Sequence, residues 1–138
     1  KAADVLPKVT AWVAKLNKNE ADYEHHVLEA LWVTWGLNKV DQKLLNQLLQ
    51  AKDYHVRAAA VKVLRYTGHQ VKNQAALLAK AVEDEHGRVR MEAFVAASWL
   101  PKETALPILA LAKNHPLDTW MDKPYEIAVA HASGPRVV

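Results

Sequence analysis

The sequence predicts an all-α protein built as a solenoid of repeated helical hairpins, and three observations support that prediction. Apolar residues recur with helical spacing along the chain, and no segment shows the two-residue alternation of a half-buried strand. Aspartate residues precede the apolar stripes, and glycine or proline follows several of them. Similar segments return at intervals set by Ala30, Ala60, Ala93 and Ala128, which are 30, 33 and 35 positions apart.

The composition suits one helical domain and excludes several classes of function. Of the 138 residues 51% are hydrophobic and 24% are charged, which is enough to build a core. The absence of cysteine excludes disulfides, thiolate zinc sites, iron–sulfur ligation and covalent haem attachment within this chain. Runs between charged residues reach about ten positions, against the roughly 20 apolar residues of a membrane helix, so we expect no membrane insertion.

In chain order we expect an opening half-repeat, three hairpins and a closing half-repeat. The opening helix covers residues 4–17 and the closing helix covers residues 122–132. Each hairpin joins a first helix to a second one, and the three pairs are 22–37 with 41–50, 53–67 with 73–84, and 88–100 with 104–114. Together they predict a single domain over residues 1–138. Because the chain begins with lysine rather than methionine, we interpret it as a fragment of a larger protein.

Residues that favour helix ends support these boundaries. Gly68 stands where a left-handed cap would end the helix 53–67. Thr104 is predicted to begin its helix, which places Pro107 in the first turn, where the missing N–H has no helical partner to lose. Five aspartates precede helical stripes and can accept hydrogen bonds from free backbone N–H groups: Asp4, Asp22, Asp41, Asp53 and Asp122.

Two segments carry the most specific repeat signal. Residues 53–60 align with residues 86–93, and each segment contains valine, then arginine, then alanine four positions after the valine. Alanine lets two helices approach closely, so we expect the valines and alanines in the repeat core: Val56, Ala60, Val89 and Ala93. We interpret Arg57 and Arg90 as structural residues rather than as an anion site, because each has an acidic residue nearby in sequence and a guanidinium group pairs well with a carboxylate.

This pattern resembles HEAT repeats, whose first helix opens with an acidic residue followed by Val-Arg and then a small residue. Here Asp53 precedes Val56-Arg57, and Asp84-Glu85 precede the second copy. The resemblance covers nearly the whole chain. It implies an α–α superhelix of about three hairpins, with the second helices on the concave side. It also implies that Arg57 and Arg90 belong to a ladder of Asp–Arg contacts between stacked repeats.

Three strings are also similar to the helical domain of large bacterial haem-binding, membrane-bound-dehydrogenase-like proteins: residues 23–32, 57–66 and 84–93. Such proteins join a sugar-dehydrogenase-like propeller, a HEAT region and a cytochrome c domain with a CxxCH motif. This chain has neither a propeller pattern nor CxxCH. The resemblance therefore implies the middle domain of an oxidoreductase, in the periplasm or cell envelope. That domain would be a spacer without a cofactor of its own, and its partners would be the neighbouring domains or another protein.

Residues able to support chemistry are few. His25, His26 and Glu29 form the most suggestive polar cluster. Only two ligands converge locally and the HExxH spacing is absent, so we do not expect a metal site. The serines, Ser98 and Ser133, have no acid–base pair nearby in sequence and no Gly-rich elbow. We therefore expect no enzymatic activity in this chain.

The acid-free stretch from Tyr54 to Val82 makes nucleic-acid binding the alternative function. The basic residues at positions 57, 62 and 65 are spread around their helix instead of forming one stripe, so a solvated basic surface is the favoured interpretation.

Tryptophan is abundant, with five residues in the chain. Four of them lie in apolar stripes and are predicted to pack in the core or between repeats: Trp12, Trp32, Trp35 and Trp99. Trp120 lies in the predicted loop 116–123, where it would plug the end of the solenoid or contact a partner. It is therefore the candidate partner contact.

Overall fold

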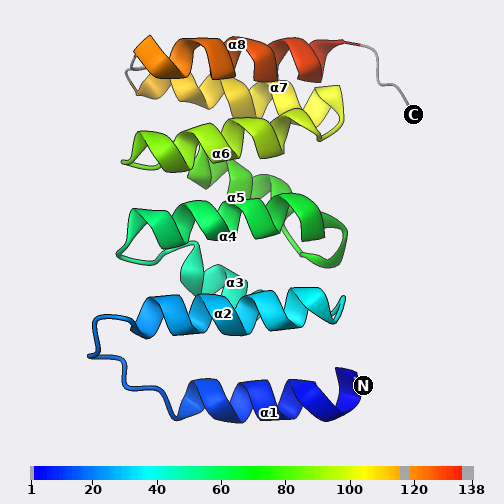
Figure 1. The fold of residues 1–138 in the computed structure, drawn as a ribbon. Coiled ribbons are helices and arrows are strands. Elements are labelled where there is room, and N and C mark those ends of the chain that lie inside the picture. Colours follow the sequence, from blue (N-terminus) through cyan, green and yellow to red (C-terminus); the bar gives the residue numbers. More distant parts are fainter. Residues whose placement is uncertain (1, 116–118, 135–138) are drawn as a thin grey trace. The chain divides into compact units, whose positions relative to one another are not determined.

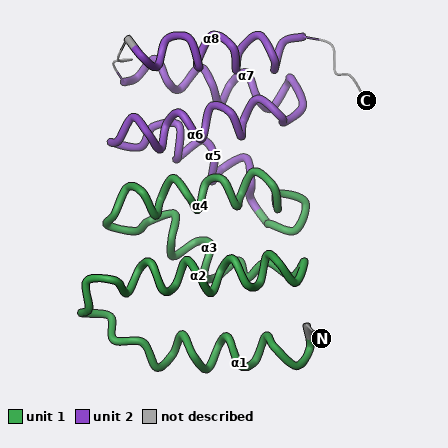
Figure 2. The backbone as a smooth tube through the Cα atoms, in the orientation of Figure 1, with its two compact units in different colours: residues 1–72 green, residues 73–138 purple. Residues whose placement is uncertain are grey.

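The computed structural model describes residues 2–115 and 119–134, and all regular structure in those residues is helical (Figure 1). The helical-repeat fold class is confirmed by this succession of short α-helices. The chain divides into two compact units, Lys1–Lys72 and Asn73–Val138 (Figure 2). The single domain predicted for residues 1–138 stays a prediction. None of the described helices is long and apolar enough to cross a membrane.

Unit 1 is a series of helices in which α2 packs against α1, α3 and α4, and α3 packs against α4. Its elements are α1 (Ala2–Ala14), α2 (Tyr23–Gly36), α3 (Gln42–Leu48), α4 (Tyr54–Thr67) and the 3-10 turn η1 (Gly68–Gln70). The most buried large side chains lie at helical spacing on facing sides of these helices: Val27, Leu31, Leu45, Leu48, Val61, Val63 and Leu64.

Side-chain amides connect the turn after α2 with the segment after α4 in unit 1. Gln42 Nε2 donates to Lys72 O at 3.0 Å, and Lys72 N donates back to Gln42 Oε1 at 3.0 Å. Val40 N donates to Gln70 Oε1 at 3.0 Å. Each amide thus satisfies backbone groups some 30 residues away, which fixes the register of one repeat against the next.

Unit 2 repeats the plan around α6, which packs against α5, α7 and α8. Its elements are α5 (Gln74–Ala81), α6 (Gly87–Ser98), α7 (Lys102–Ala110), the 3-10 turn η2 (Leu111–Asn114) and α8 (Thr119–Ser133). Phe94 is fully buried and meets the Tyr125 ring edge-on, with centroids 5.3 Å apart. The Tyr125 hydroxyl donates to Leu109 O at 3.2 Å, so one residue of α8 contacts both α6 and α7.

Two of the five predicted aspartate caps are confirmed. Asp41 accepts from Leu44 N at 3.1 Å, and Asp53 accepts from His55 N at 2.8 Å. Asp22 stands at the start of α2 but makes no side-chain cap hydrogen bond. The remaining two predictions are wrong, because α1 and α8 begin upstream of Asp4 and Asp122 and include those residues in their first turns.

Two further boundary predictions are wrong. Gly68 has a right-handed backbone, with φ −55°, because the chain tightens there into η1 instead of reversing through a left-handed cap. Helix α7 begins at Lys102 after Pro101 rather than at Thr104, so Pro107 lies in the helix beyond its first turn. The left-handed positions of the described residues are Asn38 and Asn73, and asparagine tolerates that conformation better than most residues.

Candidate functional site

The repeat positions singled out in the sequence lie on the inner sides of α4 and α6. Val56 and Ala60 are 3% and 0% exposed, and Val89 and Ala93 are 1% and 0% exposed. A buried alanine leaves space for a neighbouring helix, because its side chain ends at Cβ. These residues build the repeat core, and a partner would have to bind elsewhere.

Arg57 and Arg90 are also buried, at 8% and 7% exposed, and both contact the turn before their own helix. Arg57 Nη1 donates to Ala51 O at 2.8 Å and to Lys52 O at 3.0 Å. Arg90 Nη1 donates to Asp84 O at 2.7 Å. These bonds satisfy carbonyl groups at the end of the preceding helical segment. The ladder of Asp–Arg contacts stays a prediction.

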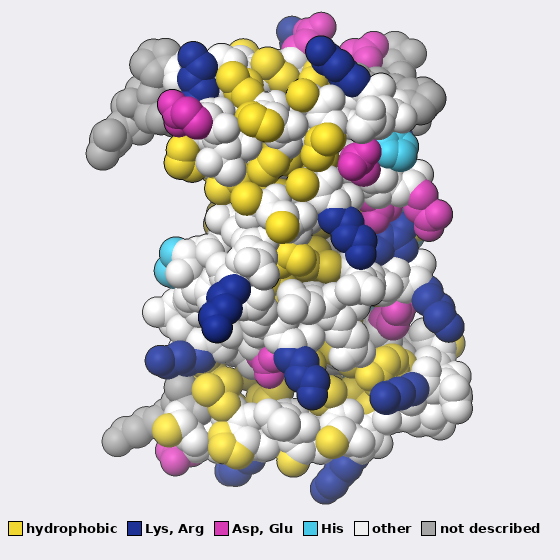
Figure 3. All heavy atoms as spheres, turned by 180° about the vertical axis from the view of Figure 1, so that it is seen from behind, with side chains coloured by type: hydrophobic (Ala, Val, Ile, Leu, Met, Phe, Trp, Pro, Cys, Tyr) yellow, Lys and Arg dark blue, Asp and Glu magenta, His cyan; other side chains and the backbone are white. Residues whose placement is uncertain are grey.

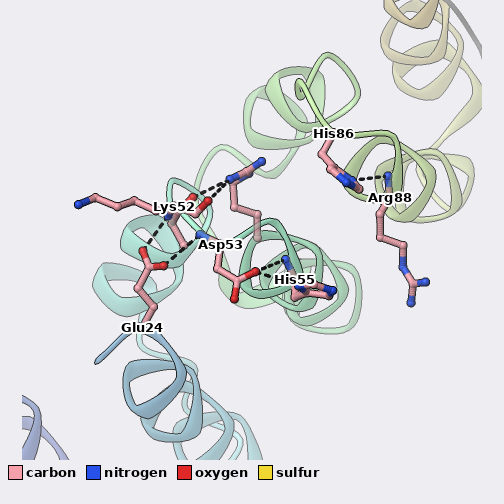
Figure 4. A network of polar contacts seen from close by, with 8 residues as sticks. Glu24, Lys52, Asp53, His55, His86 and Arg88 are labelled. Carbon is pink, nitrogen blue, oxygen red and sulfur yellow. Dashed lines mark hydrogen bonds and ion pairs between the residues drawn. The ribbon is translucent and has the colours of Figure 1, made fainter. Parts of the chain in front are cut away.

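The start of α4 is fixed from both sides (Figure 4). The Glu24 carboxylate of α2 accepts from Lys52 N at 2.8 Å and from Asp53 N at 3.1 Å. Asp53 in turn accepts from His55 N, and its Oδ1 lies 3.0 Å from His55 Nδ1. The hydrogen bond from the His55 backbone N–H holds the pKa of the Asp53 carboxyl below its ordinary value, and the contact with the His55 ring acts in the same direction.

A histidine takes the corresponding capping role at the start of α6. His86 Nδ1 accepts from Arg88 N at 3.1 Å (Figure 4). In the neutral ring the proton must therefore be on Nε2. The repeat pattern in the sequence predicts Asp84 and Glu85 as the acidic opening of this repeat. In the structure Asp84 Oδ1 accepts from His86 N at 2.9 Å, and it is His86 that caps the helix.

The candidate metal ligands of α2 contact different neighbours. The His25 ring meets Trp32 edge-on at 6.5 Å, whereas the His26 ring meets Trp12 of α1 at 6.0 Å. His26 Nε2 also lies 3.5 Å from the Asp22 carboxylate. Glu29 is exposed on the same helix. In the described part of the chain, no three His, Asp or Glu side chains are grouped as metal ligands would be.

One polar pair was missed by the sequence reasoning. The Ser98 hydroxyl of α6 lies 3.1 Å from His131 Nδ1 of α8, although 33 residues separate them. Ser98 Oγ donates to Val95 O at 2.7 Å, so its proton is directed at a carbonyl and not at the imidazole. The ring donates to the serine in this arrangement, which is the reverse of what a general base does. One signal in the sequence could have pointed to this pair. The 33 residues that separate Ser98 from His131 match the repeat period, so the two residues lie at equivalent positions of successive repeats.

Of the two placements predicted for these tryptophans, packing between neighbouring helices is found for three: Trp12 meets His26 of α2, Trp35 meets Tyr66 of α4, and Trp99 meets His131 of α8. The rings are nevertheless outside the core. Trp12, Trp32 and Trp99 are 43%, 42% and 59% exposed, whereas Trp35 is half-buried and stacks on Tyr66 at 5.8 Å. Helical spacing placed these residues beside the apolar stripe. However, a side chain at the edge of the stripe turns one ring face to solvent.

Trp120 lies in α8 and not in a loop, because that helix begins at Thr119. Other members of the predicted loop, residues 116–118, lie outside the described residues. The Trp120 ring covers Gly87 at the start of α6, where an added Cβ would meet ring atom Cζ2 at 3.1 Å. The ring is still 51% exposed, which leaves a face available to a partner.

The basic residues of the acid-free stretch serve different purposes. Arg57 is held by carbonyl oxygens, and the Arg65 guanidinium lies 4.8 Å from the Tyr66 ring centroid. Lys62 is exposed on α4, and Lys72 and Lys80 are exposed in units 1 and 2 respectively. Two of the five cations are thus already engaged within the fold, which weakens the case for a phosphate-binding surface.

Several apolar residues are exposed on the second helices of unit 2. Helices α5 and α7 pack side by side, and Figure 3 shows hydrophobic side chains gathered over this unit. Ala76 of α5 and Pro107 and Ala110 of α7 are exposed. We call these three residues, with the half-buried Leu106 and Leu111, the second-helix surface. An exposed group of apolar residues on a repeat protein is a candidate for protein contact.

Short helices that pack side by side, buried alanines at the repeat period and exposed apolar residues on the second helices define a helical-repeat protein. The model of the HEAT repeats matches residues 40–119, more than half of the chain and both Val-Arg segments, so the chain belongs to the HEAT-repeat family. HEAT repeats generally serve as scaffolds for protein interactions, and catalysis is not their typical role. Comparison with curated proteins and with solved structures gives no match.

Proposed function

We propose that this chain is a non-catalytic protein-interaction module that serves as a spacer between a dehydrogenase-like propeller and a cytochrome c domain in one larger protein. The second-helix surface of unit 2 is the observation on which this proposal rests, because it offers exposed apolar area on adjacent helices. The similarity of residues 23–32, 57–66 and 84–93 to the helical region of such proteins supports the choice of neighbours. In this role the chain carries no cofactor of its own.

The composition of the second-helix surface fits a contact with folded protein. Ala76, Pro107 and Ala110 have short side chains, so a partner can approach the backbones of α5 and α7 closely. Lys80 and Glu103 are exposed on the same two helices and supply charge of both signs beside the apolar residues. An apolar centre with a polar surround is the usual composition of a protein interface.

The test uses the domains that flank this chain in its full reading frame, produced separately and titrated against the chain by calorimetry. Ala110→Lys places a charge on the second-helix surface and is expected to weaken binding about tenfold or more. Ala130→Lys, at an exposed position near the end of α8, is the matched control. Equal affinities for Ala110→Lys and the unmodified chain would contradict the proposed surface. A reading frame without CxxCH would contradict the spacer role.

Nucleic-acid binding is the alternative, supported by the exposed Lys62 and Lys72 in an acid-free segment. It predicts binding of duplex or single-stranded DNA that falls steeply with salt. A titration between about 50 and 200 mM salt decides the matter, and absence of binding over that range removes this alternative.

A further inference from the structure

We propose that a basic surface of unit 1, formed where the start of α3 meets the segment after η1, binds an acidic segment of a partner protein that carries an apolar side chain among its carboxylates. This surface lies wholly within residues 1–72 and is separate from the second-helix surface of unit 2.

The fold brings three lysines of two different segments to this surface. They are all exposed, and we call them the lysine cluster: Lys39, Lys43 and Lys72. Gln42 exchanges two hydrogen bonds of 3.0 Å with the backbone of Lys72, and Gln70 accepts from Val40 N at 3.0 Å. Because these bonds hold the two segments side by side, the lysine cluster is a fixed feature of the surface and not three unrelated side chains.

Positive charge predominates on this part of the molecule. The segments 38–43 and 68–73 contain the lysine cluster, one histidine and one aspartate. That aspartate, Asp41, is half-buried and accepts from Leu44 N at 3.1 Å, so its carboxylate is engaged at the start of α3. Figure 3 shows Lys and Arg side chains outnumbering Asp and Glu over unit 1 on the face that it displays. Charge complementarity therefore favours an acidic partner.

A pocket next to Lys39 supplies an apolar part to the same surface. Its volume is about 340 Å³, and its walls come from α1, from α2 and from the segments that carry the lysine cluster. Leu6 of α1 and Val40 line it, together with two threonines whose methyl groups add to the aliphatic lining. A pocket of this kind accepts an aliphatic side chain.

The polar side chains of the pocket wall other than Lys39 already have partners within the fold. Thr10 and Thr34 donate their hydroxyl protons to backbone carbonyls of their own helices, at 3.2 and 2.8 Å. The Gln70 amide accepts from a backbone N–H and donates to another side-chain amide at 2.9 Å, and the Asp41 carboxylate accepts from its own helix. A polar group placed in the pocket would exchange water for few new hydrogen bonds, so the occupant is apolar and its carboxylates lie outside, against the lysine cluster.

These features favour a protein segment over a nucleic acid. Single-stranded nucleic acid needs cations that follow its backbone and aromatic side chains on which its bases stack. The lysine cluster is gathered at one place, and the residues that line the pocket include no aromatic side chain. Asp41 in the pocket wall would also repel a phosphate group.

The experiment titrates the chain with a blocked acidic peptide, Ac-Ser-Glu-Glu-Leu-Glu-Glu-Ser-NH2. Binding is followed by NMR from the backbone amide signals of Lys39, Val40 and Lys72 in about 50 mM salt, where screening is weak. We expect saturable shifts of these signals. A peptide with glutamine in place of the glutamates is expected to bind at least about tenfold more weakly, and one with serine in place of leucine about three- to tenfold more weakly.

Two matched charge reversals locate the site. Lys39→Glu, within the lysine cluster, is expected to weaken binding of the acidic peptide at least about fivefold. Lys62→Glu makes the same change at an exposed position of α4 outside the pocket wall, and is expected to leave the affinity within about twofold. Circular dichroism checks that both variants are folded.

Several outcomes would overturn the proposal. These are a lack of saturable shifts up to about 10 mM acidic peptide, equal affinity for the glutamine peptide, or equal effects of the two folded variants. Equal affinity for the serine peptide overturns the role of the pocket. An oligo(dT) of about 12 nucleotides is the comparison probe; if it binds more tightly than the acidic peptide and loses affinity with Lys39→Glu, the surface belongs to nucleic acid and the acidic protein segment is excluded. None of these results affects the second-helix surface, which has its own variants.

Discussion

Replacing Ala93 with leucine tests whether the repeat core is packed as the structure indicates. Ala93 has no exposed surface and lies on α6, which packs against three other helices of unit 2. Leucine adds three carbon atoms that cannot reach solvent without moving a helix. Overpacking of this kind costs about 1–3 kcal/mol of unfolding free energy.

The lack of space around Ala93 sets the sign and the size of the expected change in stability. At about 4 °C per kcal/mol for a chain of this size, the melting temperature should fall by about 4–12 °C. If the site had an unfilled cavity, the same three carbons would stabilise the protein by about 2 kcal/mol through added burial. The two packing arrangements thus predict changes of opposite sign.

The assay is differential scanning calorimetry of the unmodified chain, Ala93→Leu and Ala110→Leu. Ala110 is exposed on α7, so leucine there is expected to leave the melting temperature within about 2 °C, as surface substitutions usually do. An unchanged or raised melting temperature for Ala93→Leu would refute the tight helix crossing at this position.

Three further predictions concern the polar contacts at helix starts. His86→Asp is expected to raise the free energy of unfolding by about 0.5–1 kcal/mol, because an anion caps α6 better than a neutral imidazole does. Urea unfolding measures this change, and a lower urea midpoint for the variant would contradict the prediction. The lowered pKa of Asp53 contributes stability that is present above its ordinary value of 3.8 and is lost as the pH falls through the lowered pKa. The stability difference between the unmodified chain and Asp53→Asn should therefore shrink below about pH 4, since protonation removes the charge that favours the hydrogen bond from His55; a constant difference would argue against this origin. Glu24→Ala removes the acceptor of two backbone N–H groups, so it is expected to lower the free energy of unfolding by about 1 kcal/mol and to speed the hydrogen exchange of those two amides. Glu29 is exposed on the same helix, and Glu29→Ala should change neither the stability nor the exchange.

The sequence alone determined the fold class and the repeat positions. The period of the apolar residues made helices the favoured structure, and the spacing of Ala60 and Ala93 revealed the repeat. Val56 and Val89 lie in the core because a helical stripe must face its neighbours to be shielded from water. Local signals also placed the caps at Asp41 and Asp53, whose hydrogen bonds reach only two or three residues along the chain.

Only the tertiary structure decided which side chains are outside the core and which ones meet. Trp99 belongs to an apolar stripe of one helix, and His131 is a polar residue of another. The two side chains meet because α6 and α8 pack side by side. A repeat period gives the sequence distance between equivalent positions. It does not give the rotation of each helix about its axis, which decides whether Trp99 is covered or exposed. The exposure of Trp99 depends on that rotation, and for this reason the sequence pattern did not predict it.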